Sequence, residues 1–135
     1  MTPVFKAVAH PWQCDVLEHL TTRYYVAIFD DASYHYLYGL FGWNGNKDAE
    51  GRLAWVDVKH TVSYLAEVSA GDLLEVSARL AKIGGKSITI NYEMKRLADG
   101  EVVAKLESIS VLFDLTQRAA VRIPDSLRQL ADSQR

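Results

Sequence analysis

The chain has 135 residues, of which 49% are hydrophobic and 24% are charged, and its formal net charge is −2. This length is enough for one domain with a substantial core, and we expect residues 1–135 to form a single domain. Fifteen basic residues are balanced by 17 acidic ones along the chain. The composition therefore provides no basic surface for sequence-independent binding to DNA or RNA, and we expect no nucleic-acid partner.

Neither a secretion signal nor a membrane-spanning segment is predicted. The segment Met1–His10 lacks a positive leader followed by an unbroken apolar run, and no stretch approaches about 18 consecutive apolar residues. Cys14 is the single cysteine, which excludes an internal disulfide framework and cannot by itself form a structural zinc site. We therefore expect a soluble cytoplasmic protein with no membrane partner.

The first half of the chain predicts one short strand and one long helix. The strand is expected over Phe5–Ala9. Thr21 or Thr22 is a good N-cap for a helix over residues 22–41, since Ser and Thr are preferred at that position. The helix is predicted from apolar residues that recur every three or four positions, namely Tyr25, Ile28, Phe29, Ala32, Tyr36, Leu37 and Leu40.

The second half changes to a strand period. Gly42, Asn44, Gly45, Asn46 and Gly51 predict a loop. Strands rich in Val, Ile, Leu and aromatic residues follow at 53–65, 73–83, 87–97 and 102–115, separated by turn signals such as Gly84-Gly85-Lys86 and Ala98-Asp99-Gly100. Pro124 and Asp125-Ser126 then predict a short, capped C-terminal helix.

These elements predict an α+β fold in which a long antiparallel meander wraps around one central helix. A sheet of this length leaves an exposed edge, which a second copy of the chain can close. We therefore expect a homodimer or a dimer of dimers.

The segment from Gln13 to Tyr25 carries the strongest chemical signal. Asp15 lies four residues before His19 and just ahead of the predicted helix start, where the first backbone N–H groups lack intrahelical partners. Acyl transfer requires at least an ionisable group beside such donors. The carbonyl oxygen gains negative charge during attack, and the donors stabilise that charge. Spacing alone also allows Asp15 to be a simple turn or capping residue.

The order of strand, Asp-x-x-x-His, long helix and strands resembles the hotdog fold of the 4-hydroxybenzoyl-CoA thioesterase-like family over nearly the whole chain. The family pattern is roughly Asp-x-x-Gly-His-x-Asn-Asn-x-x-Tyr. This sequence keeps Asp15, His19 and Tyr25 in register. It has Glu18 in place of the glycine, and Thr21 and Thr22 in place of the asparagines.

The resemblance implies an acyl-CoA thioesterase that uses no metal or redox cofactor. In the family, the acid at the position of Asp15 attacks the thioester carbonyl or activates a water. The resemblance also implies that a backbone N–H at the helix start, near Thr22, holds the oxyanion. A desolvated, well-placed carboxylate can act in this way because proximity alone is worth on the order of 7 kcal/mol. His19 is expected to support the acid.

Substrate contacts are expected at several further residues. The family's use of this region suggests that Lys86 and Ser87, in a flexible Gly-Gly-Lys turn, contact the CoA phosphates; Arg96 is a further candidate. Tyr25, Phe29, Trp55 and Tyr64 can build the acyl chamber, although aromatic residues at such spacing are more often core. Trp12 and the tyrosines could also receive a quaternary ammonium group by cation–π contact.

The remaining histidines and the cysteine suggest no chemistry. His10, His35 and His60 have no partners at metal-ligand spacing. If residues 12–15 are extended, Cys14 and Asp15 point to opposite faces, and Cys14 is a small buried side chain.

Two other functions stay open. Hotdog hydratases use an aspartate and a histidine with a different spacing and an intervening Asn-Pro, which is not found after Asp15. A non-catalytic acyl-CoA-binding module on the same scaffold is the main alternative to the enzyme.

Overall fold

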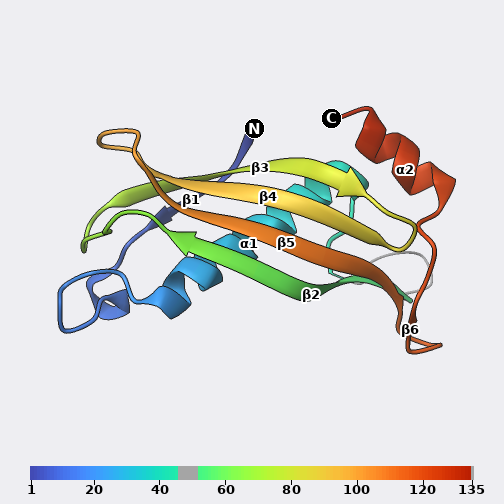
Figure 1. Cartoon of the computed structure of the whole chain (residues 1–135), viewed down its shortest axis with the longest axis horizontal. Helices are drawn as coiled ribbons and strands as arrows, with labels where there is room; N and C mark the ends of the chain where they lie inside the picture. The colour runs from blue at the N-terminus through green and yellow to red at the C-terminus, as the bar shows by residue number, and fades with distance from the viewer. Residues whose placement is uncertain (46–51, 135) are drawn as a thin grey trace.

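The computed structural model describes residues 1–45 and 52–134 of the chain, and the predicted loop positions Asn46 and Gly51 lie outside these ranges. Its elements follow the order β1 (Thr2–Val8), a 3-10 helix η1 (Pro11–Gln13), α1 (Thr22–Phe41), β2 (Leu53–Tyr64), β3 (Leu73–Ile83), β4 (Ser87–Arg96), β5 (Val102–Asp114), β6 (Ala119–Ala120) and α2 (Asp125–Asp132) (Figure 1). The predicted long strands agree with the structure to within about one residue at their ends. The predicted first strand was too short, because Thr2 already pairs with Ala78.

The strands form one antiparallel sheet in the order β1-β3-β4-β5-β2, and β6 adds to β5. The predicted meander is correct only for β3, β4 and β5, which are joined by short turns. It is wrong for β2, which pairs with β5 from Leu53↔Asp114 to Tyr64↔Ala104 rather than with β3. Residues 65–72 carry the chain from β2 across to β3, and the hydrophobic pattern of a strand does not reveal which neighbour it will take.

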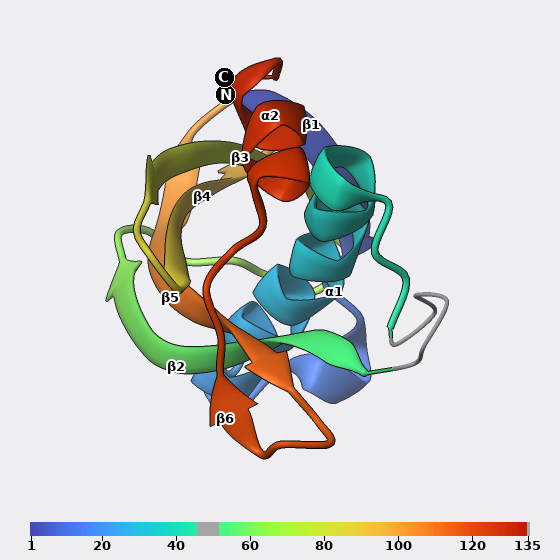
Figure 2. The ribbon, with the colours of Figure 1, turned by 90° about the vertical axis from the view of Figure 1, so that its right-hand side faces the viewer.

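Helix α1 is confirmed at residues 22–41 and is the centre of the core. Its apolar positions are buried as the spacing predicted, and Phe29 and Ala32 are completely inaccessible. They pack against the inward residues of the sheet, which on β4 occupy every second position and are Ile88, Ile90, Tyr92 and Met94. Figure 2 shows the sheet curving around this helix. The α+β fold, with a long antiparallel sheet around one central helix, is therefore confirmed.

The two ends of α1 differ in how they are capped. Thr21 is the N-cap, as one of the two predicted positions, although its hydroxyl makes no capping hydrogen bond. Gly42 ends the helix in the left-handed conformation at a φ of 67°, and its N–H donates to the carbonyl oxygen of Tyr38. This is the ending that glycine favours, because it has no Cβ to clash.

The molecule has two distinct ends. At one end lie η1, the start of α1 and the β2–β3 connection; at the other lie α2, β6 and the β3–β4 turn (Figure 1). Helix α2 begins after Pro124, so no side chain caps it, contrary to the expected cap. Among the described residues, no helix is both long and apolar enough to cross a bilayer.

Candidate active site

Asp15 begins a tight turn that ends at His19. The Asp15 N–H donates to the carbonyl oxygen of His19 at 2.9 Å, and Cys14 pairs with Leu20 just outside this bond. Oδ1 of Asp15 accepts from the N–H of Leu17 at 2.9 Å and from that of His19 at 3.4 Å. One carboxylate oxygen thus shapes the turn, as the turn interpretation of Asp15 expects, while Oδ2 has no hydrogen-bond partner among the residues that the structure describes.

This turn lines the first of two adjoining pockets, which we call the Asp15 pocket. It has a volume of about 410 Å³ and is lined by Pro11, Cys14, Asp15, Leu17, Glu18, His19, Ser69 and Ala70. Asp15 itself is exposed. Cys14 is half-buried and lines the same pocket as Asp15, so the expected separation of these two side chains was wrong. The reason is local: η1 and the turn replace the extended backbone on which that expectation depended.

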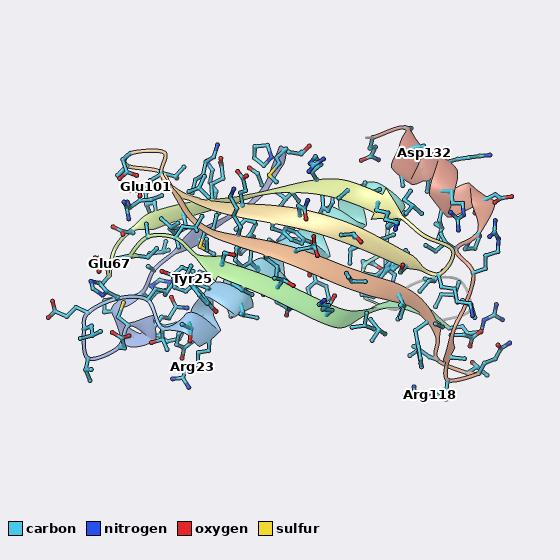
Figure 3. All side chains as sticks on the ribbon, viewed as in Figure 1. Arg23, Tyr25, Glu67, Glu101, Arg118 and Asp132 are labelled. Carbon is cyan, nitrogen blue, oxygen red and sulfur yellow. The ribbon has the colours of Figure 1, made fainter. Side chains whose placement is uncertain are left out.

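The second pocket lies at the start of α1, and we call it the helix-start pocket. Its volume is about 330 Å³, and it is lined by His19, Leu20, Thr22, Tyr25, Tyr64, Leu65, Ala66 and Glu67. Figure 3 shows Arg23, Tyr25 and Glu67 at this end of the molecule. The amides of Thr22 and Arg23 precede the first intrahelical donor position, so helix geometry gives them no acceptor within α1. Together with the helix dipole they form a ready site for negative charge.

His19 is the residue that joins the two pockets, because it lines both of them. Its Nε2 lies 3.2 Å from Oε2 of Glu67. Asp15 and Thr22, in contrast, line different pockets within one chain. The structure therefore brings Asp15 and His19 together in the first pocket and His19 and Thr22 together in the second, with His19 at the junction of the two.

Two tyrosines form the inner wall of the helix-start pocket. The rings of Tyr25 and Tyr64 meet edge to face with centroids 5.1 Å apart, and the Tyr25 hydroxyl donates to the carbonyl oxygen of Ala66 at 3.3 Å. Burial raises the pKa of Tyr25, and the neighbouring Tyr64 raises it further. Tyr25 is therefore a neutral hydrogen-bonded wall residue at neutral pH. Phe29 and Trp55, expected as chamber residues, are buried core.

Trp12 lies on the surface beside the candidate site. Its indole is 69% exposed, stacks on His10 and meets the ring of Tyr24 edge to face at 5.7 Å. It lines neither the Asp15 pocket nor the helix-start pocket. A contact between Trp12 and substrate stays a prediction.

Lys86 and Ser87 lie at the opposite end of the molecule from Asp15, in the β3–β4 turn beside α2 (Figure 1). This turn is held to the C-terminal segment: Arg128 donates from Nη2 to the carbonyl oxygens of Gly84 and Gly85. One chain therefore does not bring Lys86 and Ser87 to the pocket that contains Asp15.

Arg96 does lie at the candidate-site end, but its guanidinium is already engaged. It donates to the carboxylates of Asp99 and Glu101 and to the carbonyl oxygen of Glu67. The bond from Arg96 lowers the pKa of Asp99. Arg96 is therefore a structural clamp in this structure, and the prediction that it meets CoA gains no support.

Sequence reasoning missed Glu67 and the polar residues of β2. Oδ1 of Asp57 accepts from Ser110 at 2.7 Å, and Oδ2 lies 3.4 Å from Nε2 of His60. Glu67 was overlooked because it falls in the connection between two predicted strands, and only the pairing of β2 with β5 carries that connection to the helix start.

The comparisons with known proteins identify the family. The chain belongs to the thioesterase-like superfamily, whose profile matches residues 9–130. The long-chain acyl-CoA thioesterase FadM of Escherichia coli is 22% identical over an alignment of 125 residues, and the match covers 87% of this chain and 88% of that protein. The narrower 4-hydroxybenzoyl-CoA thioesterase-like assignment stays a prediction.

Solved structures share the hotdog fold at low sequence identity. The Staphylococcus aureus protein SAV2348, in complex with CoA, matches at a TM-score of 0.82 and 16% identity, covering 98% of this chain and 85% of that one. The 1,4-dihydroxy-2-naphthoyl-CoA thioesterase Slr0204 from Synechocystis matches at a TM-score of 0.83 and 15% identity, covering 98% and 96%.

Proposed function

We propose that this protein is an acyl-CoA thioesterase that hydrolyses an acyl-CoA thioester to the free acid and CoA, with no metal or redox cofactor. The observation that carries the proposal is the position of His19 at the junction of the Asp15 pocket and the helix-start pocket. Membership of the thioesterase-like superfamily supports the same reaction class. In this arrangement a thioester lies across the boundary of the two pockets.

The proposed roles follow from which atoms are free. Oδ2 of Asp15 attacks the thioester carbonyl or accepts a proton from the attacking water, while Oδ1 stays bound to the turn amides. The carbonyl oxygen gains charge beside the Thr22 amide, where a pre-aimed N–H donor can contribute about 100-fold or more to the rate. His19 supports the acid, and Tyr25 bounds the acyl group.

We also propose that the active form is a homodimer, or a dimer of dimers, paired along β2. This strand lies at one end of the sheet order, and Val56 and Val58 on it are 38% and 58% exposed. A register shift between Asp57 and Lys59 leaves Val58 outside the pairing with β5. Exposed edge strands with apolar side chains are templates for pairing with another chain.

A two-fold axis through β2 would place one end of a protomer beside the other end of its partner. In that arrangement the partner subunit's Lys86 and the partner subunit's Ser87 become candidates for the CoA phosphates of the Asp15 site. Trp12 is the candidate surface contact within the same chain. The cytoplasmic location stays a prediction.

The test is the release of free thiol from a panel of short-chain, long-chain and aromatic acyl-CoAs. We expect steady turnover of at least one of them, a loss of about 100-fold or more in Asp15→Asn, and little change in Cys14→Ala. Asn preserves the Oδ1 acceptor of the turn, so a loss of activity reports the missing carboxylate and not a collapsed turn. Full activity in Asp15→Asn would remove Asp15 from the mechanism.

A non-catalytic acyl-CoA-binding module is the second candidate, and the turn bonds of Asp15 favour it. Oδ1 is occupied by the amides of Leu17 and His19, and the side chain is exposed rather than desolvated. Tight binding of acyl-CoA by calorimetry, without thiol release from any member of the panel, would select this function over hydrolysis.

A further inference from the structure

The His19 imidazole has one carboxylate partner among the residues that the structure describes, and that partner is Glu67. The Nε2 to Oε2 distance of 3.2 Å is within ion-pair range. Asp15 reaches His19 only through its backbone, at the N–H and the carbonyl oxygen. The carboxylate that can set the orientation of the ring is therefore Glu67 and not Asp15.

The Glu67 side chain is exposed, but its backbone is held on both sides. The N–H groups of Leu65 and Ala66 donate to the carbonyl oxygen of Val103, and the Glu67 carbonyl oxygen accepts from Arg96. A second set of bonds ties this segment to the site: Leu20 donates to Val68 at 2.7 Å, and His19 pairs with Ser69. The backbone of Glu67 is therefore already ordered, and only its side-chain torsions must be ordered when it meets the imidazole.

The pair also lies where the proposed reaction takes place. Glu67 and His19 both line the helix-start pocket with Thr22, Tyr25 and Tyr64. A carboxylate that accepts the Nε2 proton leaves Nδ1 as the ring atom able to accept a proton in the neutral imidazole. Removal of that carboxylate frees the ring to rotate between the two pockets.

We propose that Glu67 is a positioning residue for His19: it accepts the Nε2–H and holds the imidazole across the junction of the Asp15 pocket and the helix-start pocket. The inference rests on the thioesterase function proposed above, because it assigns a role within that site. Glu67 acts through His19 and has no contact of its own with the reacting atoms.

A double-mutant cycle with the best acyl-CoA of the panel tests this assignment. Glu67→Ala is expected to lower kcat about tenfold with KM changed less than twofold, since charge-assisted hydrogen bonds orient catalytic imidazoles. Glu67→Gln keeps an acceptor oxygen and recovers most of the rate. Because Glu67 acts through His19, the Glu67→Ala change has no further effect in a His19→Gln background.

The matched control is Glu93→Ala, which removes a partly exposed carboxylate that lies 3.9 Å from Nζ of Lys105 and lines neither the Asp15 pocket nor the helix-start pocket. It should leave kcat within twofold of the native value. If the losses from Glu67→Ala and His19→Gln multiply in the double variant, or if Glu93→Ala reproduces the loss, the positioning role is overturned.

A second readout does not depend on turnover. Ring ¹³C relaxation of labelled histidines, with His19 assigned by its absence in His19→Gln, reports the order of the imidazole. We expect the His19 ring to lose order in Glu67→Ala and to keep it in Glu93→Ala. Unchanged ring order overturns the proposal even if the enzyme is active, whereas lost ring order without any acyl-CoA turnover supports the pair and removes the thioesterase function.

Discussion

The backbone N–H of Glu18 donates to the carbonyl oxygen of Asp15 at 2.9 Å, and within this turn Glu18 has a φ of +65°. A side chain in the left-handed region costs on the order of 1 kcal/mol or more, because Cβ approaches the backbone. Glu18 stands at the position where the related family pattern has glycine. The geometry gives that glycine a physical reason: the turn that presents Asp15 requires a positive φ.

Glu18→Gly is therefore expected to stabilise the protein. Relief of the left-handed strain outweighs the added freedom of glycine in the unfolded chain, and we expect a gain of about 0.5 kcal/mol in the free energy of unfolding by urea denaturation. The control is Val16→Gly in the same turn, where the side chain is 97% exposed and φ is not positive. That change should destabilise the protein slightly, and equal effects of the two variants would contradict the strain argument.

The sequence was sufficient to predict the helices and strands, because the patterns that indicate them lie within each element. The three- and four-residue spacing of apolar residues predicted α1 with its observed bounds, and the alternation between glycine-rich turns predicted β3, β4 and β5. The position of β2 was not predictable in the same way, since antiparallel pairing to either edge buries the same alternating face.

The candidate site was predictable only in part, for a related reason. Asp15, His19 and Thr22 are close in sequence, so their neighbourhood follows from the turn and the helix start. Glu67 comes 48 positions after His19 in the chain, and its approach depends on the strand order. Within one chain Lys86 lies far from Asp15, because the turn that contains it is at the far end of two long strands, and its contact with CoA stays a prediction.

Tyr36 provides a second prediction, about the core. Its hydroxyl accepts from the N–H of Leu80 at 2.7 Å, next to the register shift between Leu80 and Lys82 where the strand pairing of β3 is interrupted. Tyr36→Phe leaves a buried N–H without this acceptor, which costs about 1–3 kcal/mol in the free energy of unfolding. Tyr38→Phe, at a 60% exposed position of the same helix, should change stability by much less. Equal stability of the two variants would show that water replaces the hydroxyl.

Arg128 provides a third prediction, about the end of the molecule distant from Asp15. Its Nε donates to the carbonyl oxygen of Ile123, and its Nη2 donates to those of Gly84 and Gly85. Arg128→Ala should speed hydrogen exchange at the Ile123 amide, which donates to Gly85, and lower stability by about 1–2 kcal/mol. Arg122→Ala is the control, because that side chain is 72% exposed and has only a 3.9 Å contact with Asp125. Unchanged exchange in Arg128→Ala would contradict the clamp.

The raised pKa of Asp30 predicts how the free energy of unfolding depends on pH. Burial, and then the charges of Asp57 and Asp31, raise the pKa of Asp30 above its ordinary 3.8. The folded state therefore binds the proton more tightly than the unfolded state, and stability falls as pH rises from 3.8 through the raised folded pKa. Asp30→Asn should increase stability at neutral pH by a few tenths of a kcal/mol, since the group is largely solvent-screened, and should flatten this part of the pH profile. Urea unfolding at a series of pH values measures both effects, and a variant less stable at neutral pH would contradict the sign.

A substitution at Val58 tests the proposed pairing of two chains along β2. Its side chain is 58% exposed beside the register shift at Asp57 and Lys59. Near a two-fold axis, Val58→Lys places two like charges close together and blocks the edge, so we expect the dimer to dissociate at least tenfold more readily in light-scattering measurements. Val8→Lys is the matched control, because Val8 is 40% exposed on β1, the opposite edge strand of the sheet order. Dissociation by Val8→Lys and not by Val58→Lys would move the interface to β1. It would also remove the geometric reason for placing the partner subunit's Lys86 beside the Asp15 site.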